Sequence, residues 1–503
     1  MGMAMSCPAD NAPARTSGAL AVDLDGTLIR TDLLFESFWA AVAHSPFAAL
    51  RATGALRHGR AALKSELAGC APLRVEDLPY NQDVLDVVRA HRAGGGTTAL
   101  VTAADRGLAQ RVSAHLGLFD EVHGSGDGVN LKGAQKAEFL ASHYGEDAFD
   151  YIGDSRADLP VWARARRSYV VDGASRVRGL PHGDAPGGLA TGLSRPRLGA
   201  LVRAMRPHQW SKNVLVFLPA LAAHATSTQQ WLLSAVAFVA FCLLASGVYL
   251  LNDLLDLASD RSHPRKRFRP FASGALPLAV GTAVAPGLMA TALLLSWLAG
   301  GLPLLTMALI YVALSTAYSI YLKRKIILDI CVLAGLYTIR IVTGSVATGL
   351  ATSVWLLGFS MFFFLGLAAV KRHSEIVLKA STETGEIKGR AYLTEDLHMV
   401  ASIAISASFS AVLLFALYIN TRTAAALYPF SEALWLVAPV LIYWSSRMVG
   451  IAQRGLLHHD PIVFAFRDTV SRICFVIVLA LFVIATVGAP PGSLDWLNIE
   501  ALD

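Results

Sequence analysis

The sequence predicts a parallel α/β domain with a helical cap, followed by an all-α polytopic membrane domain of nine transmembrane helices. Two observations support this division. Up to about residue 205, charged and apolar stretches alternate, and none approaches the roughly 18–20 apolar residues that cross a bilayer. From about residue 213 onward such runs dominate, and 54% of the 503 residues are hydrophobic. That share is too high for one soluble domain.

The first domain is predicted over residues 18–172, because short apolar strands alternate there with helical stretches. The predicted strands are 18–29, 98–102 and 149–154. The predicted helices include 83–93 and 132–143. This alternation indicates a doubly wound parallel sheet. The segment at about 33–80 is mostly helical in pattern and is expected to form a cap over the sheet.

The segments around this domain are predicted to be unstructured. Residues 1–17 lack the apolar core of a signal peptide, so we expect a disordered N-terminus and a domain that stays in the cytoplasm. Residues 173–204 are rich in Gly, Pro and Arg, which is typical of a linker. The five cysteines are scattered without metal-ligand spacing, which indicates a reducing compartment and no disulfide framework.

The membrane domain is predicted over residues 205–490, with a tail at 491–503. Its apolar runs predict nine spans, at about 212–226, 231–251, 277–300, 303–322, 327–348, 353–371, 398–419, 429–447 and 470–488. Lys and Arg gather in alternate loops, whereas the opposite loops contain only Arg422. By the positive-inside rule, this asymmetry places the N-terminus on the cytoplasmic side of the membrane. The membrane is expected to be the inner (cytoplasmic) membrane. The net charge of +6 is therefore read as a topology signal and not as nucleic-acid binding.

Carboxylates and a threonine follow the ends of the predicted strands in the first domain. They are Asp23, Asp25, Thr102, Asp154 and Asp158. The carboxyl ends of parallel strands meet at one edge of a sheet, where ligands bind. Four converging carboxylates would repel one another without a cation, and oxygen-only ligands suit Mg²⁺. The sequence therefore predicts a magnesium site there.

These motifs, Asp23-Leu-Asp25-Gly26-Thr27 and Gly153-Asp154-Ser155-Arg-Ala-Asp158 with Thr102 between them, resemble the haloacid dehalogenase-like phosphatase superfamily over about residues 18–172. The resemblance implies a Rossmann-like fold in which Asp23 is the nucleophile and Asp25 the general acid/base. It also implies that Asp154 and Asp158 hold Mg²⁺, and that Thr102 and a lysine bind the phosphoryl oxygens. Both Lys132 and Lys136 suit the lysine position, and Lys132 is slightly favoured.

A second acidic motif follows the second predicted span. Asn252, Asp256 and Asp260 repeat every four residues, with Asp253 beside them, so on a helix they share one face at the membrane boundary. Carboxylates near a bilayer are costly and usually functional. With Mg²⁺, and with the basic run Arg265-Lys266-Arg267, they are expected to hold a diphosphate and neutralise its departing charge. Asp253 and Asp256 are the predicted catalytic pair.

This motif resembles the first aspartate-rich motif, NDxxDxxxD, of the UbiA-type intramembrane prenyltransferase superfamily, over about residues 200–490. The resemblance implies a helical bundle with a central cavity open to the cytoplasm and laterally to lipid. Where aromatic prenyltransferases carry a second aspartate-rich motif, this chain has Lys371-Arg372-His373-Ser-Glu375. That departure favours an anionic co-substrate.

The remaining motifs look like the branch of that superfamily that transfers phosphoribose from phosphoribosyl pyrophosphate to polyprenyl phosphate. They are Arg206-Pro207-His208-Gln209-Trp210-Ser211-Lys212-Asn213, Tyr318-Ser-Ile-Tyr321-Leu-Lys323-Arg324 and Leu328-Asp329. The resemblance implies that these segments contribute Lys212, Asn213, Tyr318 and Lys323 to substrate binding. Lys212, Lys371 or Arg372 is expected to steer the lipid phosphate.

Three hypotheses follow for the whole chain. The first is a bifunctional enzyme that makes a phosphoribosylated lipid and then removes its 5-phosphate. The second is a prenyltransferase that uses polyprenyl diphosphate with an aromatic or other acceptor. The third is a regulator or transporter-like binder with an inactive phosphatase fold. The acidic residues argue against the third hypothesis, and the missing second motif argues against the second.

Overall fold

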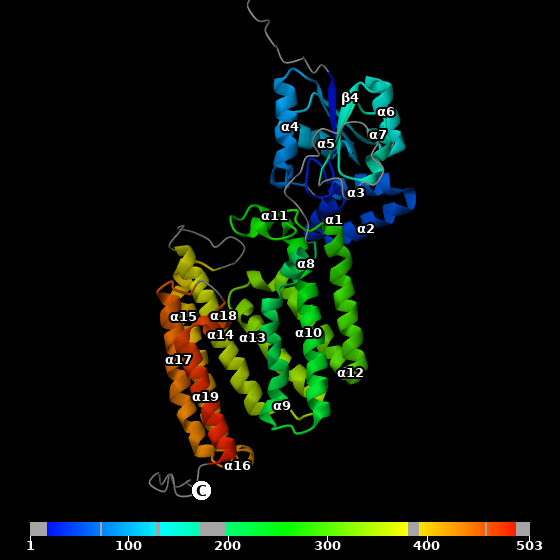
Figure 1. Ribbon diagram of the computed structural model, residues 1–503. Helices are drawn as coiled ribbons and strands as arrows, with labels where there is room; N and C mark the ends of the chain where they lie inside the picture. The colour runs from blue at the N-terminus through cyan, green and yellow to red at the C-terminus, as the bar shows by residue number, and fades with distance from the viewer. Residues whose placement is uncertain are drawn as a thin grey trace, which may run out of the picture. The chain divides into compact units, whose positions relative to one another are not determined.

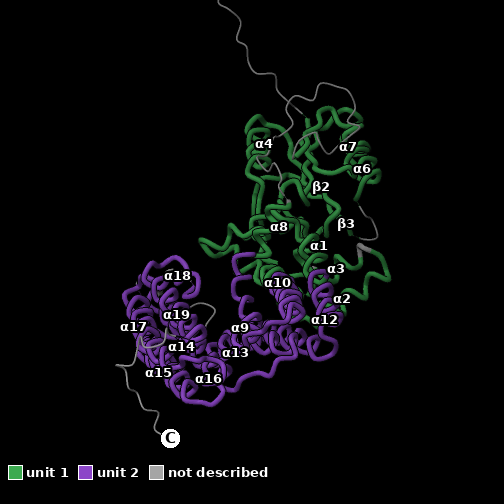
Figure 2. The backbone as a smooth tube through the Cα atoms, turned by 60° about the horizontal axis from the view of Figure 1, so that its bottom comes forward, with its two compact units in different colours: residues 1–206, 249–286 green, residues 207–248, 287–503 purple. Residues whose placement is uncertain are grey.

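The computed structural model describes residues 18–70, 73–126, 131–171, 197–380, 392–457 and 460–488. The chain forms two compact units, Met1–Arg206 with Tyr249–Pro286 and Pro207–Val248 with Gly287–Asp503 (Figure 2). The predicted N-terminus 1–17 and the tail 491–503 lie outside the described residues, as does most of the predicted linker. The last part of that linker forms helix α8 (Arg197–Met205).

A five-stranded parallel sheet forms the centre of the first domain (Figure 1). Its strand order is β3-β2-β1-β4-β5, with β1 (Ala19–Val22), β2 (Thr98–Asp105), β3 (Glu121–Ser125), β4 (Phe149–Gly153) and β5 (Arg167–Val170). The predicted parallel α/β class is confirmed. Strand β1 is shorter than the predicted 18–29, and β2 continues past Thr102 to Asp105.

Helices cover both faces of this sheet, because side chains alternate between faces along each strand. Leu20 and Val22 of β1 pack in one apolar cluster with residues of α4 (Gln82–Ala93) and α5 (Arg106–Leu116). Ala19 and Ala21 pack in another with residues of α6 (Ala134–Tyr144) and α7 (Leu159–Trp162). Strand β1 pairs directly with β4, and the two strands are parallel. Their carboxyl ends therefore lie side by side at the same edge of the sheet.

The segment between β1 and α4 is helical. It consists of α1 (Leu33–His44), α2 (Pro46–Thr53), the short 3₁₀ helix η1 (Gly54–His58), α3 (Arg60–Cys70) and η2 (Val75–Asp77). The side chain of Asp32 accepts a hydrogen bond from the Leu34 backbone and so starts α1. An apolar cluster that includes Ala41, Ala49 and Leu67 holds α1, α2 and α3 together.

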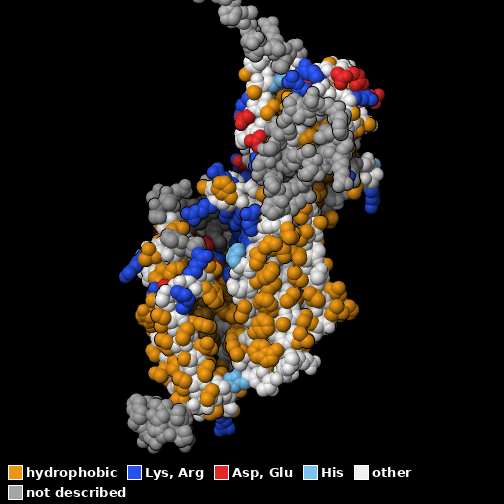
Figure 3. Space-filling view, in the orientation of Figure 1, with side chains coloured by type: hydrophobic (Ala, Val, Ile, Leu, Met, Phe, Trp, Pro, Cys, Tyr) orange, Lys and Arg blue, Asp and Glu red, His pale blue; other side chains and the backbone are white. Residues whose placement is uncertain are grey.

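The rest of the described chain is helical. In order, its elements are η4 (Pro207–Phe217), α9 (Leu218–Ala222), α10 (Thr228–Leu255), α11 (Leu257–Arg261), η5 (Lys266–Phe268), α12 (Leu278–Ile320), η6 (Leu322–Arg324), α13 (Leu328–Thr348), α14 (Val354–Ala380), η7 (Thr394–Asp396), α15 (Leu397–Ile419), α16 (Arg422–Leu427), η8 (Ser431–Leu436), α17 (Val437–Gln453), α18 (Pro461–Arg467) and α19 (Thr469–Val487). Apolar side chains cover much of the outer surface of the long helices (Figure 3), and Trp297, Phe475 and Val476 are among the exposed ones. Such a surface suits lipid contact.

The predicted count of nine spans is not confirmed. Among the described residues, seven helices are long and apolar enough to cross a membrane. Helix α12 has 43 residues, too long for one crossing of a hydrocarbon core about 30 Å thick. It kinks at Gly300 and Gly301, where φ of Gly301 is 60°, and its two parts match the predicted spans 277–300 and 303–322. The predicted first span, 212–226, instead falls on the 3₁₀ helix η4 and the five-residue α9.

Candidate active sites

Three carboxylates converge at the carboxyl edge of the sheet. Asp23 follows β1, Asp154 follows β4, and Asp158 lies in the short helix η3 (Arg156–Asp158). Ligand atoms of these three side chains all lie within 4.8 Å of one another. An all-oxygen donor set of this kind fits Mg²⁺. Gly26 makes the close approach possible, because a Cβ there would lie 2.4 Å from Asp154 Oδ2.

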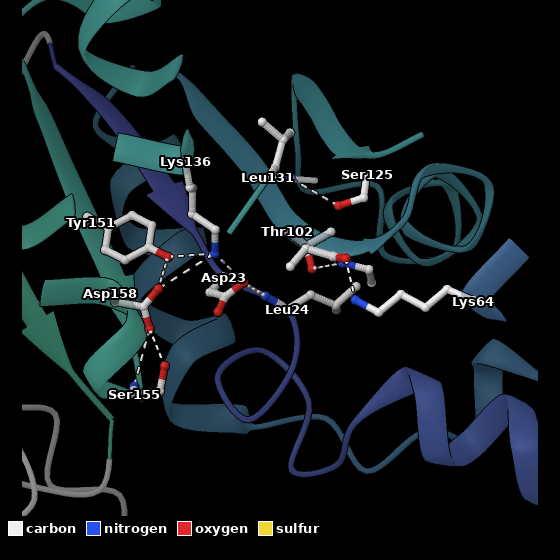
Figure 4. A network of polar contacts seen from close by, with 12 residues as sticks. Asp23, Leu24, Lys64, Thr102, Ser125, Leu131, Lys136, Tyr151, Ser155 and Asp158 are labelled. Carbon is white, nitrogen blue, oxygen red and sulfur yellow. Dashed lines mark hydrogen bonds and ion pairs between the residues drawn. The ribbon is translucent and has the colours of Figure 1, made fainter. Parts of the chain in front are cut away.

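The cation beside the nucleophile position is Lys136, on α6. Its Nζ lies 2.9 Å from Asp23 Oδ1 and 3.6 Å from Asp158 Oδ1, and its side chain is almost fully buried (Figure 4). Burial opposes protonation of this amine, but the Asp23 and Asp158 carboxylates outweigh it, so the pKa of Lys136 is raised. The structure thus places Lys136, and not the slightly favoured Lys132, against Asp23. Lys132 also lines the cavity, but no ion pair joins it to Asp23 in the described part of the chain.

Tyr151 links the lysine to the acidic cluster, a role that the sequence analysis did not foresee. Lys136 Nζ donates to the Tyr151 hydroxyl at 2.9 Å, and that hydroxyl donates to Asp158 Oδ1 at 2.8 Å. The other Asp158 oxygen, Oδ2, accepts from the backbone N–H and hydroxyl of Ser155. These bonds fix Asp158 before any metal binds. Tyr151 lies in β4 among apolar residues, so the sequence indicated only that its side chain belongs to the hydrophobic core.

Asp25 and Thr102, the other two predicted residues of this site, lie in different surroundings from each other. Asp25 lines the same cavity, and its Oδ1 accepts a hydrogen bond from the Leu33 backbone at 2.8 Å. Burial, followed by repulsion from Asp32, raises the pKa of Asp25 well above its usual range. Thr102 is buried, and its hydroxyl accepts from the Ala104 backbone. The cavity lining contains the neighbouring Ala103 but not Thr102.

The second acidic motif lies at the end of α10 and in α11, within the same compact unit. The helix is interrupted at Asp256, yet the backbone bonds from Asp256 to Asn252 and from Asp260 to Asp256 keep the i to i−4 pattern. Asp253 and Asp260 are buried, whereas Asn252 and Asp256 are half-buried. The predicted shared face of the motif is therefore largely kept, although two of its carboxylates are closed off from solvent.

Two arginines outside the predicted binding set neutralise those buried carboxylates. Asp253 Oδ1 accepts hydrogen bonds from Arg206 and, at 3.1 Å, from Arg269. Arg269 also donates to Asp260 Oδ2 at 2.6 Å. Asp260 Oδ1 is buried without a hydrogen-bond partner in the described part of the chain. Among the described residues, the ligand atoms of Asp253, Asp256 and Asp260 do not gather within 4.8 Å of one another, in contrast to those of Asp23, Asp154 and Asp158.

The predicted basic run contributes little to this cluster. Arg265 and Arg267 are exposed, and the Arg267 guanidinium lies over the Phe268 ring at 4.9 Å. Lys266 is half-buried in the same short 3₁₀ helix. Arg269, two residues beyond this run, forms ion pairs with Asp253 and Asp260. Arg269 reaches the acidic motif because it follows the 3₁₀ helix η5. Its spacing from the motif in the sequence does not by itself indicate this contact.

In the second compact unit, two predicted lysines meet on one carboxylate. Lys212 Nζ lies 3.0 Å and Lys371 Nζ 3.1 Å from the same oxygen, Oδ2, of Asp460. Burial opposes ionisation of Asp460, but Lys371 and Lys212 outweigh it, so its pKa lies well below the usual range. Two ammonium groups beside one carboxylate leave a net positive charge that suits an anionic ligand. Asp460 precedes α18 and belongs to none of the motifs identified in the sequence, so the sequence analysis did not predict its role.

Other predicted binding residues of this unit are engaged in buried contacts. Arg372 pairs with Asp329 at 2.6 Å, and both side chains are fully buried. Tyr392 also donates to Asp329, at 2.6 Å. Asn213 Oδ1 accepts from Arg340 Nε at 2.7 Å. In this structure Arg372 and Asn213 are therefore buried and paired with side chains of α13.

Tyr318 and Lys323, the last two predicted binding residues, lie close together in the chain. Tyr318 is in the last turn of α12, and Lys323 is in η6. Both are half-buried. The structure brings neither of them to the Lys212–Asp460–Lys371 cluster through any contact it records.

Fold and sites thus define a membrane transferase fused to a hydrolase domain. The UbiA prenyltransferase family profile matches residues 213–383, and the haloacid dehalogenase-like hydrolase profile matches residues 20–162. The chain belongs to the UbiA prenyltransferase family and carries an N-terminal haloacid dehalogenase-like hydrolase domain. It is therefore an enzyme, and its apolar helices make it a multi-pass membrane protein.

Three relatives illustrate this assignment. Protein y4nM of Sinorhizobium fredii is 38% identical and is matched over 93% of this chain and 90% of its own length. Nodulation protein NoeC of Azorhizobium caulinodans is 36% identical over 54% of this chain and 88% of its own length. Decaprenyl-phosphate phosphoribosyltransferase of Mycolicibacterium smegmatis is 31% identical over 58% of this chain and 92% of its own length.

Proposed function

We propose that this protein is a Mg²⁺-dependent bifunctional enzyme. Its membrane half transfers 5-phosphoribose from phosphoribosyl pyrophosphate to polyprenyl phosphate, and its hydrolase domain then removes the 5-phosphate from the lipid product. The observation that carries the hydrolase step is the Asp23–Lys136–Asp158 cluster, in which the nucleophile position is ion-paired with a lysine and lies beside two further carboxylates, Asp154 and Asp158. The transferase step is supported by the similarity to decaprenyl-phosphate phosphoribosyltransferases.

In the hydrolase step, an Asp23 carboxylate oxygen attacks the phosphorus of the monoester, and the bond from phosphorus to the ribose oxygen breaks. Asp25, whose pKa is raised by burial, donates the proton that the leaving oxygen needs. Water activated by Asp25 then releases inorganic phosphate from Asp23. Lys136 binds the phosphoryl oxygens. Asp23, Asp154 and Asp158 would hold Mg²⁺, which would offset the negative charge of those oxygens.

In the transferase step, the bond between the ribose anomeric carbon and pyrophosphate breaks, and a bond to the lipid phosphate oxygen forms. Asn252, Asp253, Asp256 and Asp260 would hold Mg²⁺, which would supply positive charge to neutralise the departing pyrophosphate. Asp256 is half-buried and open to solvent, which suits a direct role. Lys212 and Lys371 bind the phosphate of the lipid acceptor, since both ammonium groups already meet at one anion, Asp460.

The proposed location is the inner membrane, with the hydrolase domain in the cytoplasm. Phosphoribosyl pyrophosphate is charged and water-soluble, so the acidic motif must face the compartment that holds it. The hydrolase domain belongs to the same compact unit as this motif. The basic loops around the acidic motif agree with that side of the membrane.

Mass spectrometry of lipid products made by the purified protein tests this proposal. Wild type supplied with phosphoribosyl pyrophosphate, polyprenyl phosphate and Mg²⁺ should form the dephosphorylated ribosyl lipid. The Asp23→Asn variant should accumulate the 5-phosphorylated lipid. Equal release of inorganic phosphate by both proteins would overturn the hydrolase assignment. No ribose label in the lipid phase would overturn the transferase assignment and favour polyprenyl diphosphate as the donor.

A further inference from the structure

The hydrolase cavity extends well beyond its acidic cluster. Its volume is about 620 Å³, which is within the range of pockets that enclose whole ligands. A phosphoryl group beside Asp23 would fill only a small part of it. The rest of the cavity must therefore receive the group to which the phosphate is attached.

One wall of this cavity comes from segments far from the hydrolase domain in sequence. Ala200 and Arg203 belong to α8, and residues 274–279 lead into α12. All these residues belong to the same compact unit as the sheet. Apart from Arg203 and Gly274, this wall is apolar, consisting of Ala200, Ala275, Pro277, Leu278 and Ala279.

Buried contacts hold this wall against the cap. Arg261 of α11 donates two hydrogen bonds to Glu36 of α1, at 2.6 and 2.9 Å, and both side chains are at most 7% exposed. Trp39 Nε1, also in α1, donates to the Thr282 hydroxyl at 2.9 Å. A buried ion pair is favourable only in accurate geometry, so these contacts mark a specific docking of the 274–282 segment on the cap.

Two arginines lie on this side of the cavity. Arg203 comes from α8, and Arg30 packs directly on Gly274, where a Cβ would lie 2.6 Å from the Arg30 Cβ. Neither guanidinium forms an ion pair within the described residues, and Arg30 Nε is buried without a hydrogen-bond partner there. Within the described residues, the hydrogen bond of the Arg30 guanidinium is a long one, from Nη2 to Asn81 Oδ1 at 3.5 Å. Unpaired guanidinium groups in a partly buried cavity favour a phosphate ligand.

We propose that Arg30 and Arg203 form a second anion subsite, which binds a phosphodiester of the hydrolase substrate while the apolar wall receives the start of its lipid chain. The substrate class is thus a phosphomonoester that also carries a phosphate-linked lipid, and not a free sugar phosphate. This inference rests on the proposed hydrolase function. It adds the residues by which the domain would select a lipid-linked substrate.

Steady-state kinetics of the full-length protein in detergent with Mg²⁺ tests the subsite. The probes are ribose 5-phosphate and a 5-phosphoribosyl phosphodiester of a short prenol. Wild type should prefer the prenol phosphodiester by at least about tenfold in kcat/KM, and Arg30→Gln and Arg203→Gln should each reduce that preference by about tenfold. Most of the change should appear in KM. The control Arg89→Gln alters an exposed arginine of α4 and should keep the preference.

Gly274→Ala gives a second test that leaves every charge in place. The added methyl group must displace Arg30, so the preference should fall as in Arg30→Gln. Gly95→Ala is the matched control, because Gly95 has a positive φ of 78° like the 73° of Gly274, but a Cβ there meets nothing within 4 Å. Equal kcat/KM for the two probes in wild type, or an unchanged preference in both arginine variants, would overturn the subsite. Loss of phosphate release with both probes in wild type would instead overturn the hydrolase function itself.

Discussion

Glu36 and Arg261 lie 225 residues apart in the sequence, yet they form a buried ion pair with two hydrogen bonds. Glu36 Oε1 also accepts a 2.7 Å hydrogen bond from the Thr31 hydroxyl. The pair joins α1 of the hydrolase domain to α11, the short helix that contains the end of the transferase motif. Residues 249–286 thus belong to the same compact unit as the hydrolase domain.

Breaking this pair on one side should destabilise the unit. Glu36→Gln or Arg261→Gln leaves the partner charge buried, which costs about 3 kcal/mol. The double variant should lose clearly less than the sum of the two, because neither charge is then left alone. Denaturant titration in detergent measures these free energies of unfolding. The exposed pair Arg89–Asp86 is the control, and its loss should cost about 0.5 kcal/mol or less. Additive losses in the double variant would contradict direct coupling.

Lys136 and Lys132 are expected to differ sharply in hydrolysis. Lys136→Met removes the buried cation at Asp23, so kcat for p-nitrophenyl phosphate should fall at least about a hundredfold. Lys132 is exposed at the cavity edge, and Lys132→Met should cost less than about tenfold. The larger loss in Lys132→Met would show that the phosphoryl group is held by Lys132 instead.

Metal dependence should follow the three-carboxylate cluster. After chelation with EDTA, phosphate release should cease and return on addition of Mg²⁺. Asp154→Asn should raise the Mg²⁺ concentration for half-maximal activity by at least about tenfold, because one charged ligand is lost. Asp83→Asn, an exposed residue of α4, is the control. Full activity in chelated wild type would rule out the metal role.

The transferase should depend on Asp256. Its replacement by Asn removes a charged metal ligand, and transfer of ribose label from phosphoribosyl pyrophosphate into lipid should fall at least about a hundredfold. Hydrolysis of p-nitrophenyl phosphate by the same variant should continue, since Asp256 does not line the hydrolase cavity. Wild-type transfer by Asp256→Asn would remove this residue from the proposed site.

The lysines that meet on Asp460 should govern the lipid acceptor. Lys212→Met and Lys371→Met should each raise KM for polyprenyl phosphate by about tenfold, because a charge-assisted bond to phosphate is lost. KM for phosphoribosyl pyrophosphate should change less. Lys325→Met, an exposed lysine over the Tyr321 ring, serves as the control. Equal effects on both KM values would indicate a general structural defect.

Some features follow from the sequence because they depend on local patterns. Strands that alternate with helices predicted the parallel sheet, and the three predicted strands overlap β1, β2 and β4, whereas β3 and β5 were not predicted. Apolar runs predicted the long helices, but run length alone did not distinguish a kinked helix such as α12 from two spans. It also counted η4 and α9 as a span, because a 3₁₀ helix and a short helix can be as apolar as a membrane helix.

The residue types of both sites were also evident from the sequence, since carboxylates at strand ends and at a membrane boundary are costly without a function. The partners of those carboxylates were decided only by tertiary structure. Lys136 reaches Asp23, Arg269 reaches Asp260, and Asp460 gathers two lysines, all through contacts between separate elements. An ion pair needs its atoms within about 4 Å, and sequence spacing cannot determine such distances between elements that meet only after folding.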